Sequence, residues 1–177
     1  MADVSVEKLD NVSRRDLNDL CDAAEAAIEE GGGFGWLDVP ERGVLENYWR
    51  GVLLVPERTL FVGRLDGVIA GSAQLGRPTK NNEAQSHAAM LTTNFVAPWA
   101  RGYGIGFGLI DAVERLALKE EYTVLNLDVR ATQDAAIARY DSLGFVRWGE
   151  NPYYARVGEK WVTGYYYFKE LWSEESE

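Results

Sequence analysis

The spacing of apolar residues in the N-terminal third of the chain predicts a short strand and two helices. The apolar residues of the first helix recur at three- and four-residue intervals and so share one face: Leu17, Leu20, Cys21, Ala24 and Ile28. Ser13 is a typical first residue for such a helix, and the glycines at 31–33 are typical of its end. We therefore predict a strand over Val4–Leu9, a helix from Ser13 to about Glu30, and a second helix from about Pro40 to Leu54.

The rest of the chain predicts six more strands and two more helices. The strands are Thr59–Arg64, Val68–Leu75, Ser86–Val96, Tyr122–Val129, Phe145–Trp148 and Trp161–Phe168. One helix begins near Ile105 and the other spans about Asp134–Leu143, and no repeat or linker divides the chain. This order predicts an α/β architecture, a mixed sheet with helices on both faces. We expect a single domain over residues 1–177, with an acidic tail from about residue 173.

The composition is that of an ordinary globular protein and narrows the classes of function. The chain has 177 residues, of which 46% are hydrophobic and 26% charged, with a formal net charge of −10. That negative charge argues against a nucleic-acid surface, which needs a basic patch. A single cysteine and a single histidine leave no disulfide framework and too few ligands for a Cys- or His-based metal centre. Without a leader pattern or a membrane-length apolar stretch, we expect a cytoplasmic protein with no membrane association.

The segment 94–110, which joins a predicted strand to a predicted helix, contains the most informative motif. Its residues Arg101-Gly-Tyr-Gly-Ile-Gly106 place glycines where backbone N–H groups meet the positive end of a helix dipole. Such a turn suits phosphate, because glycines let a ligand approach the backbone and Arg101 adds a cation. Two familiar phosphate motifs do not match. Phe107 follows Gly106 where a Walker loop needs Lys, and no frame supplies the third glycine of a dinucleotide fingerprint.

Two motifs in the chain resemble those of the GNAT acyl-CoA-dependent N-acetyltransferases. The first is Arg-x-x-Gly-x-Gly at Arg101–Gly106, with Val96-x-Pro98 ahead of it, which resembles the pyrophosphate-binding signature of that family. The second is Leu127-Asp-Val129, then Gln133-x-x-Ala136, then Tyr140-Asp-Ser-Leu-Gly-Phe145, with Gln133 standing where the family usually has Asn. The order of the predicted elements is also similar, so the resemblance covers nearly the whole chain.

The resemblance implies acetyl-CoA as cosubstrate, no metal, and a set of site residues. It implies a mostly antiparallel sheet whose fourth and fifth strands splay apart, which leaves backbone groups at Phe95 and Val96 for the pantetheine arm. The residues implied for the pyrophosphate are Arg101, Gly102, Tyr103, Gly104, Ile105 and Gly106. Gln133 is implied to contact the pantetheine arm or the acyl group. We expect direct acetyl transfer to a primary amine of a small molecule or peptide, with Tyr140 protonating the leaving thiolate.

The general base stays open on the sequence alone. The stretch His87–Thr93, ahead of the glycine turn, has no carboxylate where the family often has a glutamate. His87, Asp128, Glu83 and a water-mediated route are the alternatives. Cys21 lies on the apolar face of its helix, so we expect a buried hydrophobic side chain and no acetyl-cysteine intermediate.

The acceptor pocket is expected between the first two helices with their loop and the segment Gly149–Gly164. Its candidate aromatic walls and ammonium-binding acids are Phe34, Trp36, Trp49, Tyr153 and Tyr154, with Asp38, Glu41 and Glu46. Two other functions compete with this one. A non-catalytic acyl-CoA-binding sensor would explain the missing base and Gln133, and a nucleotide-dependent oxidoreductase would use Asp128 on a ribose. The C-terminal strands are a candidate homodimer interface.

Overall fold

The computed structural model describes residues 1–32 and 34–172, and each predicted strand and helix has a counterpart there. The elements are β1 (Val4–Leu9), α1 (Arg14–Glu29), α2 (Arg42–Val52), β2 (Arg58–Leu65), β3 (Val68–Gly76), η1 (Glu83–Gln85), β4 (Ala88–Val96), η2 (Pro98–Ala100), α3 (Ile105–Lys119), β5 (Val124–Arg130), α4 (Asp134–Ser142), β6 (Val146–Val157) and β7 (Lys160–Glu170). The predicted acidic tail from residue 173 lies outside the described residues. None of the helices in the described ranges is long and apolar enough to cross a membrane.

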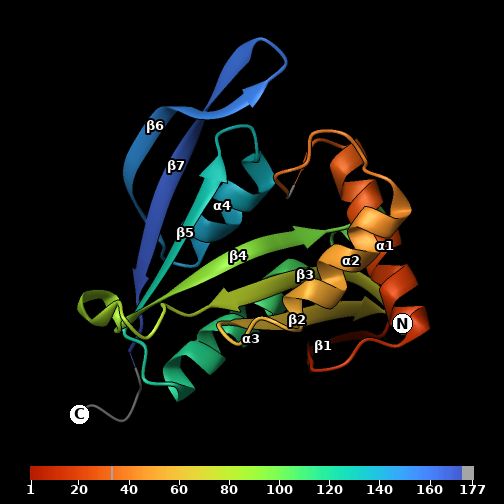
Figure 1. The fold of residues 1–177 in the computed structure, drawn as a ribbon, viewed down its shortest axis with the longest axis horizontal. Coiled ribbons are helices and arrows are strands. Elements are labelled where there is room, and N and C mark those ends of the chain that lie inside the picture. Colours follow the sequence, from red (N-terminus) through yellow and green to blue (C-terminus); the bar gives the residue numbers. More distant parts are fainter. Residues whose placement is uncertain (33, 173–177) are drawn as a thin grey trace.

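The strands form one seven-stranded sheet in the order β1-β2-β3-β4-β5-β7-β6. Every neighbouring pair is antiparallel except β4 and β5, which run parallel. The prediction of a mixed, mostly antiparallel sheet is confirmed. Figure 1 shows β4 and β5 diverging from a common end of the sheet, with the β6–β7 hairpin beyond them.

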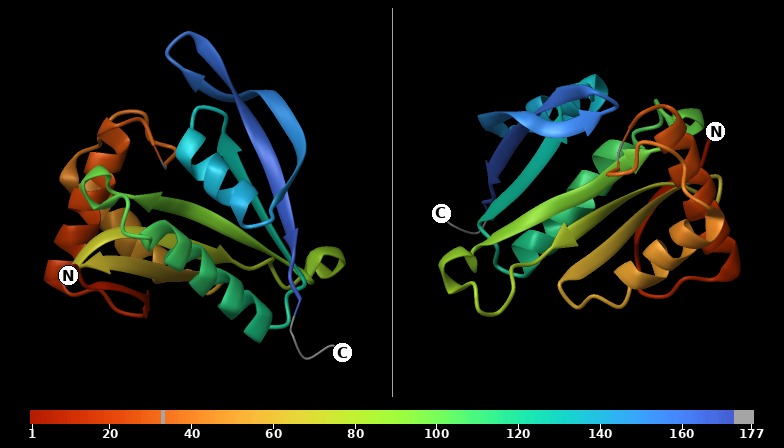
Figure 2. Two further views of the ribbon diagram at one scale, coloured as in Figure 1. Left: turned by 180° about the vertical axis from the view of Figure 1, so that it is seen from behind. Right: turned by 45° about the horizontal axis from the view of Figure 1, so that its top comes forward.

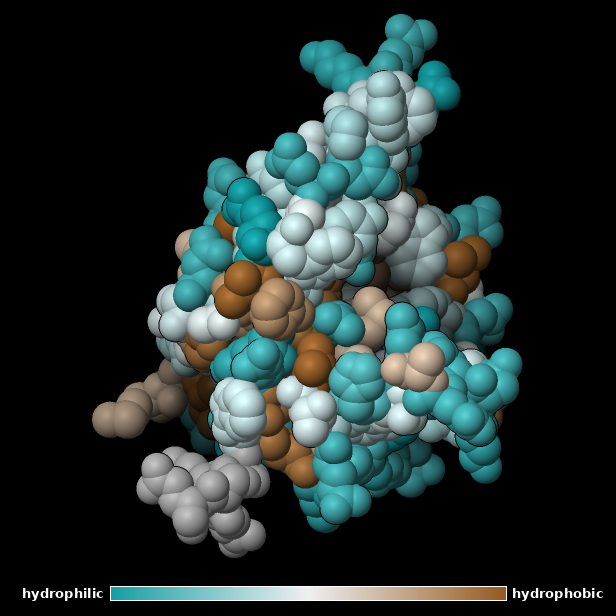
Figure 3. Space-filling model, turned by 90° about the vertical axis from the view of Figure 1, so that its left-hand side faces the viewer, coloured by the Kyte–Doolittle hydropathy of each residue, from teal (hydrophilic) through white to brown (hydrophobic). Residues whose placement is uncertain are grey.

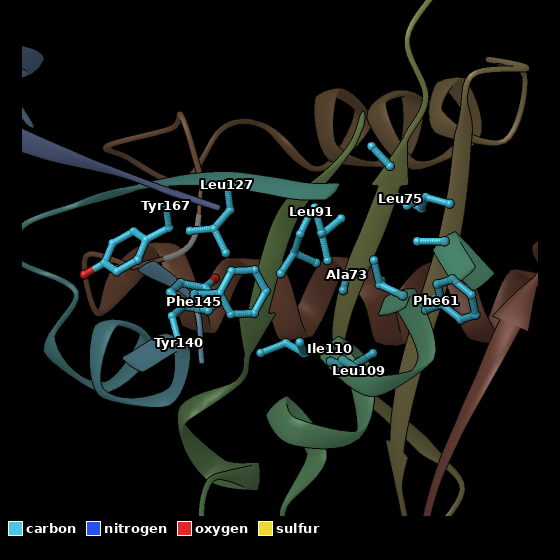
Figure 4. Packing of buried hydrophobic residues seen from close by; sticks show 14 of the residues in the cluster. Phe61, Ala73, Leu75, Leu91, Leu109, Ile110, Leu127, Tyr140, Phe145 and Tyr167 are labelled. Carbon is cyan, nitrogen blue, oxygen red and sulfur yellow. The ribbon is translucent and has the colours of Figure 1, made fainter. Parts of the chain in front are cut away.

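The helices cover both faces of this sheet, as predicted. Helices α1 and α2 lie on one face, and α3 and α4 lie on the other (Figures 1 and 2). Side-chain alternation in β2 serves both layers, because Leu60 and Val62 pack under α1 and α2 while Phe61 packs under α3. Figure 4 shows the second layer, where Tyr140 lies among the buried side chains beside Phe145. Residues of β4 enter both cores, so the strand is held from both sides.

The parallel strands β4 and β5 separate along most of their length. They share only three residue pairs, and the last of these joins Met90 to Asn126. Beyond that pair the strands continue to Val96 and Arg130 without pairing to each other. The predicted splay is therefore confirmed. It leaves backbone groups of both strands free to bind another partner.

A bulge in β4 accompanies this splay. Phe95 lies opposite Ser72, but Thr92 lies opposite Gln74, so β4 has one residue more than β3 over this stretch. Thr93, within the extra stretch, has a φ of 49°, which is rare for a β-branched residue. A bulge bends its strand, and this one lies in the part of β4 that no longer pairs with β5.

Strand β6 is much longer than the sequence indicated. The prediction stopped at Trp148, whereas the strand continues to Val157 and forms a long hairpin with β7. Its register against β7 shifts twice, between Arg147 and Gly149 and between Asn151 and Ala155. Such shifts interrupt the two-residue period on which strand prediction depends. The segment expected to line the acceptor pocket is this hairpin, whose end projects at the top of the molecule in Figure 3.

Candidate functional site

The glycine turn between β4 and α3 has the backbone geometry of an anion-binding site. Gly102 and Gly104 have φ angles of 84° and 82°, which side chains with a Cβ rarely allow. The first helical hydrogen bond of α3 runs from Gly108 N to Gly104 O at 3.0 Å, so the N–H groups of residues 105–107 have no partner within the helix. No side chain caps this end, and its first turn has no acidic residue. The free N–H groups can therefore bind an anion.

A cavity of about 380 Å³ lies beside this turn, between the end of α1, β4 and the start of α4. Its lining residues are Ala27, Glu30, Gly31, Gly32, Asn94, Phe95, Val96, Arg101, Thr132, Gln133, Asp134, Ala135, Ala136 and Arg139. Four residues predicted to bind the cosubstrate, Phe95, Val96, Arg101 and Gln133, are among them. The others, Gly102–Gly106, lie outside this lining. Arg101 forms an ion pair with Glu30, so the predicted phosphate-binding cation has an acidic partner.

Arg139 is a second cation at this cavity, and the sequence alone did not indicate it. A Cβ at Gly106 would lie 2.5 Å from the Cζ atom of Arg139, so the guanidinium lies against the first turn of α3. Its Nε atom is buried without a hydrogen-bond partner, and no salt bridge within the described residues includes it. Burial lowers the pKa of Arg139, and the charge of Arg101 contributes to the lowering. A cation without an acidic partner here is suited to a phosphate.

A larger cavity of about 830 Å³ lies where β4 and β5 diverge. Its lining residues are Phe34, Gly35, Trp36, Leu37, Tyr48, Leu91, Thr92, Thr93, Asn94, Asp128, Val129, Arg130, Gln133, Ala136, Tyr140, Tyr154, Ala155 and Arg156. Asn94, Gln133 and Ala136 line both cavities, so the two adjoin.

Partnerless polar atoms concentrate along these two cavities. Four buried side-chain nitrogen or oxygen atoms among the described residues have no hydrogen-bond partner. Three of them belong to lining residues: Thr92 Oγ1, Asn94 Oδ1 and Arg139 Nε. Because buried polar atoms in folded proteins nearly always have partners, these three indicate the path of a polar ligand.

Tyr140 is held in a protonated state at the large cavity. The residue is 5% exposed, and Asn94 Nδ2 donates a hydrogen bond to its phenol oxygen at 3.2 Å. Burial raises the pKa of Tyr140, and the hydrogen bond from Asn94 opposes part of that rise. Since the amide donates to the phenol oxygen, the phenolic proton remains available for another acceptor. This is the arrangement that a general acid needs.

Gln133 connects the start of α4 to the loop that follows α1. Its Nε2 donates to Gly31 O at 2.9 Å, and a Cβ at Gly32 would lie 3.1 Å from its Oε1. The longer arm of Gln relative to Asn makes this contact possible. Its predicted contact with a pantetheine arm or acyl group stays a prediction.

The facing of Asp128, which the sequence left open, is decided by its neighbours in β5. Leu127 and Val129 belong to the core under α3 and α4, so alternation directs Asp128 and Arg130 to the other face. Both of these charged residues line the large cavity. Asp128 is therefore the one carboxylate of the described residues that lines it.

An aromatic wall stands next to Asp128. Tyr154 donates its phenolic proton to Asp128 Oδ2, and burial raises the pKa of Tyr154. The Tyr154 ring lies over Gly164, where any Cβ would overlap with it. Phe34 and Trp36 line the same cavity, as expected, and Tyr48, which the sequence did not indicate, joins them. These rings give the cavity an apolar side.

Several other candidates lie away from both cavities. His87 and Glu83, offered as bases, are exposed and line neither cavity. Trp49, Tyr153, Asp38, Glu41 and Glu46, which were expected at the acceptor pocket, also line neither cavity. Trp49 is fully buried in the core under α1 and α2, and Tyr153 is 67% exposed on the hairpin. Trp49 and Tyr153 are thus sequence neighbours of the lining residues Tyr48 and Tyr154 but do not line the cavity themselves.

Cys21 is buried as predicted. Cys21 is 0% exposed, belongs to the hydrophobic core under α1 and α2, and lines neither cavity. Burial raises its pKa to about 11, so the thiol stays protonated at neutral pH. A protonated, enclosed thiol is a poor nucleophile.

A seven-stranded α/β sheet that splays between β4 and β5, with an uncapped glycine turn beside the gap, defines the class of protein. The model described as the acetyltransferase (GNAT) family matches residues 20–145. That match spans more than half of the chain, which therefore belongs to the GNAT family. The predicted family, fold and enzyme class, an acetyl-CoA-dependent acyltransferase, are confirmed.

Similar proteins agree with this assignment. An uncharacterized N-acetyltransferase of Azospirillum brasilense, from the hisH-hisA intergenic region, is 62% identical over 133 residues, covering 75% of this chain and 79% of that protein. An N-acetyltransferase structure from Staphylococcus aureus Mu50 has a TM-score of 0.80 at 18% identity, covering 96% of this chain and 99% of that one. The structure of yncA from Salmonella typhimurium, with its cofactor acetyl-CoA, has a TM-score of 0.75 at 16% identity, covering 98% and 96%. The two structures show a shared fold.

Proposed function

We propose that this protein transfers the acetyl group of acetyl-CoA to the amine of an acceptor by direct attack within a ternary complex. The observation that carries the proposal is the pair of adjoining cavities along the splay. One has the cations Arg101 and Arg139, and the other has the protonated Tyr140. Direct attack is supported by the burial of Cys21, the single cysteine of the chain.

The residues of both cavities fit acetyl-CoA. The free N–H groups at the start of α3, with Arg101 and Arg139, would hold its phosphates. The unpaired end of β4 would offer backbone groups to the amides of the pantetheine arm. The partnerless Thr92 Oγ1 and Asn94 Oδ1 lie along the same path.

Tyr140 and Asp128 divide the proton transfers between them. When bound, acetyl-CoA supplies an acetyl thioester at the large cavity. An alkylammonium with a pKa of about 10.4 must first lose a proton, which costs about 4.6 kcal/mol at pH 7. Asp128 is exposed at the cavity, accepts that proton and passes it to solvent. Tyr140 donates its proton to the leaving sulfur and regains one as the acetylated nitrogen loses its second proton.

Thiol release tests this function directly. Purified protein is mixed with acetyl-CoA and a panel of amines, free CoA is measured with a thiol reagent, and products are identified by mass spectrometry. Tyr140→Phe should lower kcat by about 100- to 10,000-fold, the usual contribution of a general acid, while the Kd for acetyl-CoA stays within about threefold. Tyr153→Phe is the matched control, because that exposed tyrosine lines neither cavity.

Two outcomes would contradict the proposal. Full activity of Tyr140→Phe would show that Tyr140 is not the general acid. Tight acetyl-CoA binding without thiol release for any amine would instead indicate a non-catalytic acyl-CoA sensor.

A further inference from the structure

The charged groups of the large cavity differ in sign from the chain as a whole. The chain has a formal net charge of −10, yet the charged lining residues are Arg130, Arg156 and the single acid Asp128. None of these three takes part in a salt bridge within the described residues. Two arginines without carboxylate partners at a ligand cavity are suited to an anionic group.

Arg130 is positioned by contacts at both of its ends. Its backbone lies opposite Gly164 of β7, and its NH2 group donates to Phe34 O at 3.0 Å. The side chain therefore reaches from β5 to the loop after α1, and that loop also lines the cavity. One carbonyl uses one of the five N–H donors of a guanidinium, which leaves others for a ligand.

Asp128 and Arg130 present opposite charges on one face of the same strand. Residues two apart in a strand lie about 7 Å apart, given a rise of about 3.3 Å per residue. A molecule whose amine and acid group are separated by a few bonds can therefore reach both side chains. Arg156, an exposed residue of β6, adds a second cation at the edge of the cavity.

We propose that the acceptor is a zwitterionic amine of the amino-acid type, a claim that rests on the proposed acetyl transfer. Its ammonium group binds at Asp128, and its carboxylate binds at Arg130, with Arg156 nearby. Its apolar side chain packs against the aromatic wall of Phe34 and Trp36. A polyamine or a neutral alkylamine would leave both guanidinium groups without an acidic partner.

Binding measurements separate this proposal from the chemistry. The ligands are leucine, methionine, phenylalanine and tryptophan, each as the free acid, the carboxamide and the decarboxylated amine. Titration calorimetry is run on the protein saturated with CoA, so no turnover is needed. At least one free acid should bind about tenfold or more tightly than its own amide and amine.

Three variants test which residues recognise the acid group. Arg130→Met and Arg156→Met should each reduce the preference for the acid over the amide, with Arg130→Met bringing it to within about threefold. Arg130→Lys keeps the charge and should keep part of the preference. Arg115→Met is the control, because Arg115 is exposed on α3 and pairs with Asp111. It should change nothing.

The outcomes distinguish the two proposals. An acid that binds selectively but is not acetylated would contradict acetyl transfer and leave the zwitterion site in place. Amides or simple amines that bind as well as the acids would overturn the zwitterion site, even if they are acetylated. Absence of binding by every acid in the panel would overturn it too.

Discussion

Replacing Arg139 with Met should stabilise the free protein and weaken acetyl-CoA binding at the same time. In the free protein the buried Nε of Arg139 has no hydrogen-bond partner, and the charge of Arg101 is unfavourable to it. A buried donor without a partner costs about 1–3 kcal/mol. Removing that donor should therefore stabilise the fold by about the same amount. Loss of the cation–π contact with the Phe107 ring, whose centroid is 5.6 Å from the guanidinium, offsets about 0.5–1 kcal/mol of this stabilisation. The expected net stabilisation of Arg139→Met is about 0.5–2 kcal/mol.

The effect on binding has the opposite sign. A hydrogen bond between a guanidinium and a phosphate contributes about 1.5–3 kcal/mol. Without it, the Kd for acetyl-CoA should rise about 10- to 150-fold. A residue whose only role was to support the fold would not weaken binding while raising stability.

Thermal melting and titration calorimetry together check this prediction. For a chain of 177 residues, 1 kcal/mol corresponds to about 2–4 °C, so Tm of the free variant should rise by about 1–8 °C. Arg115→Met should change neither quantity, because Arg115 is exposed and pairs within its own helix. A lower Tm with unchanged acetyl-CoA affinity would refute the reasoning and make Arg139 a structural residue.

Two further predictions concern the acceptor wall and the stability of the fold. Gly164→Ala should lower the free energy of unfolding by about 1–3 kcal/mol, the usual cost of overpacking, and should raise KM for the amine by displacing the Tyr154 ring, without changing the Kd for acetyl-CoA. Gly149→Ala, whose Cβ would meet nothing nearer than 4.0 Å, is the control, and equal KM values would contradict the wall. The hydrogen bond from Arg64, at 2.8 Å, holds the pKa of Asp16 below its ordinary value. The contribution of the Asp16–Arg64 pair to the stability of the fold is therefore present above about pH 3.9. It is lost as the pH falls through the lower pKa that Asp16 has in the folded protein. Urea unfolding should show Asp16→Asn destabilised by roughly 1 kcal/mol at pH 6 and by progressively less as the pH falls below about 3.9, and a difference that does not change with pH would count against the pair.

The secondary structure and the glycine turn followed from the sequence because they depend on residues a few positions apart. Ser13 Oγ accepts the N–H of Asp16 at 3.0 Å, as the start of α1 required. The positive φ of Gly102 and Gly104 and the uncapped start of α3 also follow from local chain geometry. Burial of Cys21 followed from helical periodicity in the same way.

The residues that line the two cavities are brought together by contacts between distant parts of the chain. Gln133 binds Gly31 across a sequence separation of 102, and Arg130 binds Phe34 across 96. Arg139 acquires its place because Gly106, on another helix, has no side chain to exclude it.

The sequence by itself thus determined the family, the order of elements and the phosphate turn. Only the tertiary structure decided that Asp128, and neither His87 nor Glu83, lies at the large cavity. The physical reason is that a side chain's direction is known within its own strand, whereas its neighbours depend on how strands and helices pack. Pairing between β4 and β5 stops after three residue pairs, and the bulge in β4 that accompanies this depends on the register of β4 against β3.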